Sequence, residues 1–184
     1  KEDLYKVYDI AHKRGILLYG PPGSGKSSTI QIIVADVITK RDGVVLKFDD
    51  PSIFIDGMRK FREIQPNTPI VVLMEDLDSI IEMWDESEVL NVLDGVDDIK
   101  KVVFLATTNY PETLEDRFSN RPSRFDRRFH MPHPNEESRK IYFEYLVSGR
   151  EQVMQDHGVE VDLDRWVKDT AEMSIAHLNE LFVA

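Results

Sequence analysis

Hydrophobic residues along this chain fall into two kinds of segment that alternate. Continuous apolar runs of strand length stand at 16–19, 70–74 and 102–106, and 44–48, which contains Lys47, is a further strand candidate. Runs that are apolar at every position are typical of strands buried on both faces, as in parallel sheets. Between them apolar residues recur at helical spacing, as in Ile30, Ile33, Val34, Val37 and Ile38. The alternation predicts an α/β fold with a doubly wound parallel sheet.

The pattern changes near Pro134, after which only helical signals occur. Asn135 is expected to cap a helix that turns inward Ile141, Tyr142, Tyr145 and Leu146. Ser174 is expected to cap another that turns inward Leu178, Leu181 and Phe182. We predict an α/β core over 1–133 and a small, incomplete helical lid over 134–184. The chain is expected to be a fragment, because its last residues resemble a helix cut in mid-course.

One stretch fits neither pattern. Residues 20–27 read Gly-Pro-Pro-Gly-Ser-Gly-Lys-Ser and fit G-x-x-x-x-G-K-[ST] at every fixed position, between a predicted strand and a predicted helix. Glycines let successive N–H groups turn toward a polyanion, and the loop delivers that anion to a helix N-terminus. Lys26 is expected to reach the β- and γ-phosphates, and Ser27 to hold Mg²⁺ through its hydroxyl. The predicted nucleotide-binding residues are Gly20, Pro21, Pro22, Gly23, Ser24, Gly25, Lys26, Ser27 and Ser28.

Polar residues follow two of the other predicted strands. Glu75 and Asp76 come directly after the run at 70–74, where a P-loop site needs carboxylates for a metal and for the attacking water. The usual order at this point is Asp then Glu, and neighbouring side chains on an extended segment face opposite ways. We assign Glu75 to the metal and Asp76 to the water. Asn109 follows the run at 102–106 and is suited to hold the water or the γ-phosphate.

The bulk composition narrows the choice of function. The formal net charge of −11 argues against a nucleic-acid partner, because phosphate binding depends on Lys and Arg. The absence of cysteine excludes disulfides, thiolate metal sites and cysteine nucleophiles. It fits an intracellular location, the cytoplasm first and an organelle matrix as the alternative. No apolar run is long enough to span a membrane.

A basic block at 121–128, Arg-Pro-Ser-Arg-Phe-Asp-Arg-Arg, stands out against this acidic background. One interpretation is a solvated surface or a surface that faces nucleic acid. The other is a set of arginines that act in trans on a transferring phosphoryl group, which requires a neighbouring subunit.

Together the segments 14–27, 74–78, 89–95, 106–109 and 121–127 resemble the AAA clade of the AAA+ ATPases over nearly the whole chain. The resemblance implies an ATP-driven, ring-forming motor, usually a homo-hexamer, that uses ATP and Mg²⁺ and acts on a protein substrate. It implies that Asn109 is sensor 1, and that Arg121 and Arg124 are arginine fingers reaching the ATP of the next subunit. The Glu-Asp order resembles the mitochondrial AAA proteins that help assemble the bc1 complex.

Two segments depart from the clade's pattern. Residues 174–177, Ser-Ile-Ala-His, stand where the clade usually has Ser-Gly-Ala-Asp. Phe54, Ile55 and Gly57 stand near the pore-loop position with altered spacing, and a half-buried helix is the other interpretation. Two further functions stay open, namely a nucleotide-gated binding or scaffold module with vestigial hydrolysis and a DNA-associated ATPase.

Overall fold

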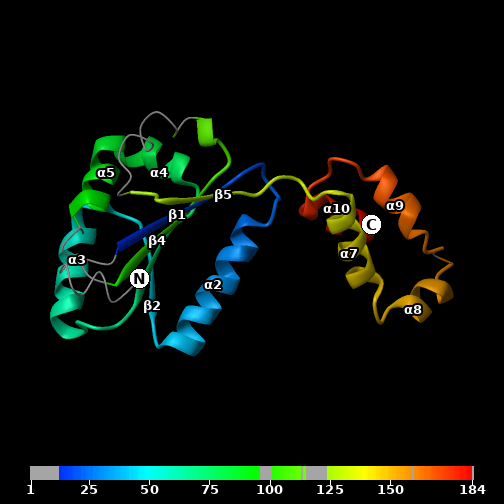
Figure 1. Ribbon diagram of the computed structural model, residues 1–184, viewed down its shortest axis with the longest axis horizontal. Coiled ribbons are helices and arrows are strands. Elements are labelled where there is room, and N and C mark those ends of the chain that lie inside the picture. Colours follow the sequence, from blue (N-terminus) through cyan, green and yellow to red (C-terminus); the bar gives the residue numbers. More distant parts are fainter. Residues whose placement is uncertain (1–12, 96–100, 113, 115–123, 159, 184) are drawn as a thin grey trace. The chain divides into compact units, whose positions relative to one another are not determined.

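A computed structural model describes residues 13–95, 101–112, 114, 124–158 and 160–183. Within these ranges the chain forms two compact units (Figure 1). The first contains residues 13–20 and 26–130, and the second contains residues 21–25 and 131–183. Residues 1–12 lie outside the described ranges, and Lys13 begins the first strand. No helix in the described part of the chain is long and apolar enough to cross a membrane.

The first unit is built on a five-stranded sheet in the order β2-β3-β4-β1-β5, with every neighbouring pair parallel. The strands are β1 (Lys13–Tyr19), β2 (Val44–Lys47), β3 (Ile70–Met74), β4 (Val102–Thr108) and β5 (Arg127–His130). The predicted parallel sheet is confirmed. Strand β5 was not expected, because it comes from the basic block and all four of its residues are exposed.

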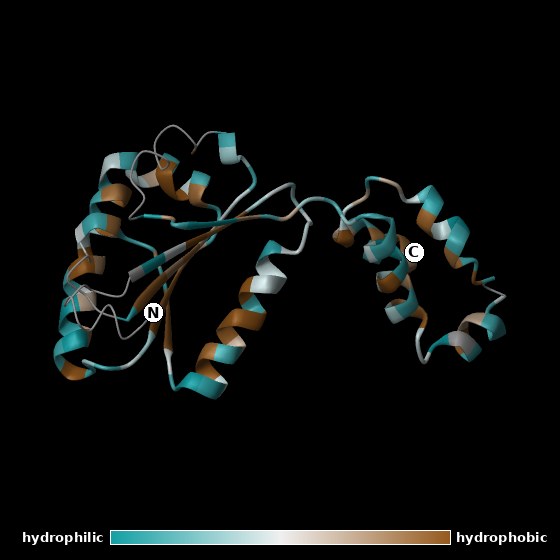
Figure 2. Ribbon diagram, in the orientation of Figure 1, coloured by the Kyte–Doolittle hydropathy of each residue, from teal (hydrophilic) through white to brown (hydrophobic). Residues whose placement is uncertain are grey.

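Helices cover both faces of this sheet, with α2 on one side and α3 and α5 on the other (Figure 1). The helices of this unit are α2 (Lys26–Arg41), α3 (Pro51–Ile64), α4 (Leu77–Trp84) and α5 (Glu86–Gly95). Alternate strand residues such as Val72 and Phe104 pack in one buried cluster with Met58 of α3 and Leu93 of α5. Successive side chains on a strand point to opposite faces, and both faces of this sheet are covered, so β3 and the segment 102–106 of β4 are apolar at every position (Figure 2).

Helix α3 decides between the two interpretations of residues 54–57. Phe54 and Ile55 are half-buried and pack against the main cluster. The Phe54 ring lies 5.2 Å from that of Phe48, centroid to centroid. Asp50 caps the helix by accepting from the Ser52 N–H at 2.8 Å, and Pro51 occupies its first turn. The structure therefore shows the half-buried helix, in which both side chains pack against the core of their own unit.

The second unit is helical. It contains α7 (Glu136–Val147), α8 (Glu151–Asp156), α9 (Leu163–Asp169) and α10 (Ile175–Val183) around a core of Phe143, Leu146, Val167 and Leu178. The predicted Asn135 cap is confirmed, since its Oδ1 accepts from the Ser138 N–H at 2.8 Å. The predicted inward face of α7 was partly wrong, because Ile141 and Tyr145 are 59% and 72% exposed.

The inward stripe of α7 is instead Arg139, Phe143, Leu146 and Val147, which recur at i, i+4, i+7 and i+8. Leu181 of α10, also expected inward, is 54% exposed. Arg139 is buried because its guanidinium donates to the carbonyl oxygens of Val167, at 3.0 Å from Nη2, and of Pro134, at 2.9 Å from Nη1. The polar group therefore sets the rotation of the helix, which an apolar pattern alone does not show.

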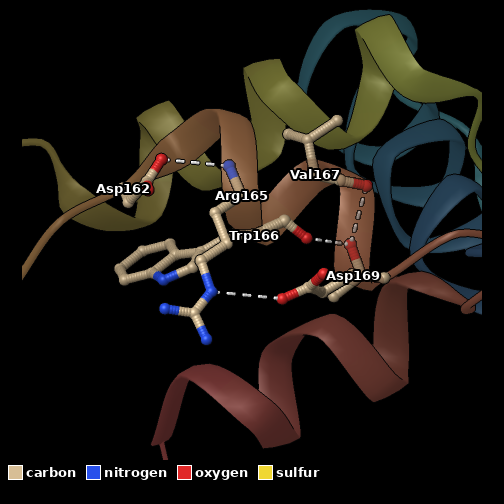
Figure 3. A network of polar contacts seen from close by, with 6 residues as sticks. Asp162, Arg165, Trp166, Val167 and Asp169 are labelled. Carbon is tan, nitrogen blue, oxygen red and sulfur yellow. Dashed lines mark hydrogen bonds and ion pairs between the residues drawn. The ribbon is translucent and has the colours of Figure 1, made fainter.

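Helix α9 is held by local polar contacts (Figure 3). Asp162 caps it by accepting from the Arg165 N–H at 3.0 Å, and Arg165 pairs with Asp169 one turn later at 3.4 Å. Trp166 turns its ring toward Phe143, 5.6 Å away between centroids. These contacts order a small unit whose apolar core is limited.

Candidate active site

The glycine-rich loop between β1 and α2 has the backbone conformation that its sequence predicts. Gly20, Gly23 and Gly25 have φ angles of 149°, 73° and 94°, which side chains with a Cβ rarely adopt. The loop starts where β1 ends, and the Gly20 N–H donates to the Thr108 carbonyl oxygen of β4 at 3.3 Å. It ends at Lys26, the first residue of α2, so it delivers a ligand to the N-terminus of a sixteen-residue helix.

Lys26 is buried, with 7% of its surface exposed, and its ammonium donates to the Gly20 carbonyl oxygen at 2.8 Å. Burial lowers its pKa, and the negative charges of Asp76 and Asp78 partly oppose that effect. A cation in this position is stabilised further by an anion brought to the loop. Ser27 and Ser28 follow it in the first turn of α2, and both are exposed.

Within the second unit, the start of α10 lies against the loop. The Ala176 N–H donates to the Gly23 carbonyl oxygen at 3.4 Å. A Cβ on Gly23 would stand 2.6 Å from the hydroxyl of Ser174, so no other residue fits there without movement. Ser174 is 1% exposed and its hydroxyl accepts from the His177 N–H at 3.3 Å, which confirms the predicted cap. The segment 174–177, which departs from the pattern of the AAA clade, therefore packs on the phosphate-loop glycine.

Glu75 and Asp76 form the turn between β3 and α4, and both are exposed. Asp76 has a left-handed backbone, with φ of 52° and ψ of 60°, and its carboxylate makes no capping hydrogen bond to α4. Its N–H donates to the Thr107 hydroxyl of β4 at 3.0 Å, which fixes the turn against the neighbouring strand. Of the two carboxylates, Asp76 is the one whose charge acts on Lys26.

Asp78 is a part of the site that the sequence did not single out. Its carboxylate accepts from the Thr108 hydroxyl and from the backbone N–H of Asn109, while burial raises its pKa. The Thr108 hydroxyl also accepts from the Tyr110 N–H at 2.9 Å. The half-buried Asn109 thus sits in a chain of hydrogen bonds that ties the end of β4 to the start of α4. The two threonines just before Asn109 were the available signal.

Of the two predicted arginine fingers, the structure describes only Arg124. Arg121 lies outside the described residues. Arg124 is described and is 5% exposed, and its guanidinium makes two hydrogen bonds to the Asp94 carboxylate, Nε to Oδ1 at 3.1 Å and Nη2 to Oδ2 at 2.9 Å. The paired arginine is thus held inside its own chain.

The donor set fits a nucleotide with its magnesium ion. Glycines without a Cβ, a buried ammonium and a helix N-terminus suit a polyphosphate. Among the described residues no group of three or more His, Cys, Asp or Glu side chains could hold a metal by itself. That fits Mg²⁺, which proteins commonly bind through one or two ligands together with phosphate oxygens and water.

Residues 16–133 match the family described as "ATPase family associated with various cellular activities (AAA)". This match covers more than half of the chain, from β1 through β5. The chain belongs to the AAA family of ATPases. ATP is therefore its nucleotide, with Mg²⁺ as the usual partner ion.

Similar curated proteins point to the same family. The chain is 28% identical over 196 residues to the probable 26S proteasome regulatory subunit 6B of Caenorhabditis elegans, covering 97% of this chain and 46% of that protein. It is 30% identical to the 26S proteasome regulatory subunit S10B homolog B of Arabidopsis thaliana, over 90% of this chain and 44% of that protein. A third relative is the ATP-dependent zinc metalloprotease FtsH of Lancefieldella parvula, 30% identical over 88% of this chain and 26% of that protein.

The chain thus spans less than half the length of these curated relatives. What it shares with them is the ATPase region.

Proposed function

We propose that this chain is the ATPase part of a ring-forming motor that hydrolyses Mg²⁺-ATP and couples hydrolysis to remodelling or translocating a protein. The observation that carries the proposal is the charge arrangement around Lys26. A buried ammonium ends a loop of positive-φ glycines, and the carboxylates of Asp76 and Asp78, at the start of α4, act on it through their charge. Such an arrangement suits phosphoryl transfer, which depends mainly on positioning and charge.

Each residue has a proposed role at this sheet edge. The amides of residues 20–28 bind the phosphates, and Lys26 neutralises their charge. Ser27 and Glu75 supply the metal ligands, while Asp76 orients the attacking water. Asn109 donates its side-chain amide to that water or to the terminal phosphate oxygen, and its place in the Asp78 network fixes its backbone.

The assembly and the substrate are proposed from the relatives. Two are named as regulatory subunits of the proteasome and one as an ATP-dependent protease, which supports a protein substrate. The net charge of −11 argues against a nucleic-acid substrate. We propose a homo-hexamer or another closed ring, in which Arg121 and Arg124 complete the site of the next subunit. An intracellular location stays the prediction from the sequence.

Phosphate release measured across protein concentration tests this function. Turnover per chain should rise with concentration, because the complete site needs a neighbour, and Lys26→Ala should abolish both ATP binding and turnover. Tight ATP binding with no phosphate release at any concentration would instead show a nucleotide-gated module. Turnover that rises only when DNA is added would show a DNA-associated ATPase.

A further inference from the structure

Two adjacent threonines end strand β4, between the phosphate loop and the acidic turn. Strand β3 pairs with β4 only as far as Ala106, whereas β4 continues to Thr108. On its other side β4 stays paired with β1 up to Thr108. Thr107 and Thr108 therefore extend past β3 beside the turn at 75–76, while their backbone still lies next to the strand that leads into the phosphate loop.

The Thr107 hydroxyl holds the backbone of the acidic turn. The Thr107 side chain is buried, with 2% of the residue exposed, and its hydroxyl accepts from the Asp76 N–H at 3.0 Å. Asp76 has a φ of 52°, a left-handed conformation that residues other than glycine rarely adopt. Such a conformation persists only where neighbouring contacts hold it, and this hydrogen bond is one of those contacts.

The Thr108 residue joins three parts of the site. Its hydroxyl donates to the Asp78 carboxylate and accepts from the Tyr110 N–H at 2.9 Å. Its carbonyl oxygen accepts from the Gly20 N–H, the first amide of the phosphate loop, at 3.3 Å. The Asp78 carboxylate also accepts from the Asn109 N–H. A hydroxyl has one hydrogen to donate, so the contact with Asp78 fixes the orientation of a side chain that is fully buried.

We propose that Thr107 and Thr108, together with the Asp78 carboxylate, are positioning residues for the reaction centre. They hold the Asp76 carboxylate and the Asn109 side chain in one fixed arrangement beside the phosphate loop. This inference rests on the proposed function, in which those two groups contact the attacking water or the terminal phosphate. Because phosphoryl transfer depends mainly on positioning, loosening these contacts costs rate more than it costs ATP affinity.

The test compares two substitutions of Thr108 in the assembled protein. Thr108→Val keeps the shape of the side chain and removes its hydroxyl, whereas Thr108→Ser keeps the hydroxyl. We expect Thr108→Val to lower kcat by between about tenfold and a hundredfold, with ATP affinity and KM unchanged. Thr108→Ser should recover most of that rate. Thr107→Val should likewise lower kcat without weakening ATP binding.

A matched control and a double-mutant cycle complete the design. Thr39→Val removes an exposed threonine hydroxyl of α2, which donates to the Ala35 carbonyl oxygen of the same helix at 2.7 Å, and it should keep the wild-type kcat. Asp78→Asn and Thr108→Val remove the same contact from its two ends. Their combination should therefore lose less rate than the product of the two single losses.

The outcomes distinguish this inference from the proposed function. Wild-type protein without turnover would contradict the proposed function, and this inference with it. With an active wild type, an unchanged kcat in Thr108→Val, or Thr108→Ser as slow as Thr108→Val, would overturn only the inference. Loss of ATP binding in step with kcat in Thr108→Val would show a purely structural role and overturn it too. Additive losses in the cycle would overturn the joint action of Thr108 and Asp78.

Discussion

Lys26 and Arg124 are two buried cations of one sheet unit, exposed by 7% and 5%, and they are held in opposite ways. The Lys26 ammonium donates to a carbonyl oxygen. Burial is the main cause that lowers its pKa, and the charges of two nearby carboxylates only partly oppose that effect. The Arg124 guanidinium is locked to a carboxylate by two hydrogen bonds. The first arrangement leaves a cation that an arriving anion stabilises, and the second fixes a donor in space.

The largest expected effects come from replacing these two cations, because one substitution should lower ATP affinity and the other should lower kcat. Lys26→Ala should lower ATP affinity by about a hundredfold or more, because it removes a charge-assisted contact to the phosphates. Arg124→Ala should leave ATP affinity near wild type and lower kcat by about 10³-fold or more. Binding of a fluorescent ATP analogue and phosphate release measure the two quantities. Loss of ATP binding in both variants would contradict the separate roles of Lys26 in binding and Arg124 in turnover.

The next effect concerns the carboxylates beside Lys26. Glu75→Gln should raise the Mg²⁺ concentration needed for half-maximal turnover, since Glu75 is assigned to the metal. Asp76→Asn should leave that concentration unchanged and lower kcat by about a hundredfold, because it removes the group that orients the water. Magnesium titrations of ATP turnover measure both. The reverse result would exchange the two roles.

Gly15→Ala tests the fixed backbone on the Arg124 side. The new methyl would collide with the Arg124 carbonyl oxygen, so the free energy of unfolding should fall by about 3 kcal/mol and turnover should fall with it. Gly57→Ala is the matched control, because nothing lies within 4 Å of a Cβ there and the residue is inside α3. It should gain about 0.5–1 kcal/mol. Urea unfolding curves measure both, and equal stabilities would contradict the close approach.

The smallest effect is a pH dependence at Asp78. Its raised pKa means that the folded state binds its proton more tightly than the unfolded state, so its contribution to stability falls as pH rises. The unfolding free energy of wild type minus that of Asp78→Asn should therefore be larger below pH about 4 than at pH 7. Urea unfolding at the two pH values measures this difference. A difference that grows with pH would show that burial does not dominate at Asp78.

The same contrast explains what the sequence could predict. The residues around Lys26 form one contiguous motif with fixed spacing, directly between an apolar run and a segment with helical periodicity. The loop at 20–28 and the strand β1 were therefore predictable from the sequence. The Arg124 arrangement joins Gly15, Asp94 and Arg124 from three separate elements. No local pattern encodes such a contact, because it depends on how the elements pack.

Other misses have physical causes of the same kind. Strand β5 carries the sequence Arg-Arg-Phe-His and lies at the edge of the sheet, where a strand needs no apolar run. The rotation of α7 follows from the buried Arg139, whose polar contacts override the apolar pattern. Asp78 was not predicted because it lies in the first turn of α4, where a carboxylate is usually a solvated side chain.

The most direct test of the shared active site is to mix two inactive variants. Lys26→Ala lacks a phosphate site but keeps its arginine, and Arg124→Ala keeps its phosphate site but lacks the arginine. If Arg124 serves the ATP of a neighbouring copy, mixed assemblies should hydrolyse ATP faster than the sum of the two variants alone. Mixtures that form assemblies but stay at that sum would contradict a site completed by the arginine of the next subunit.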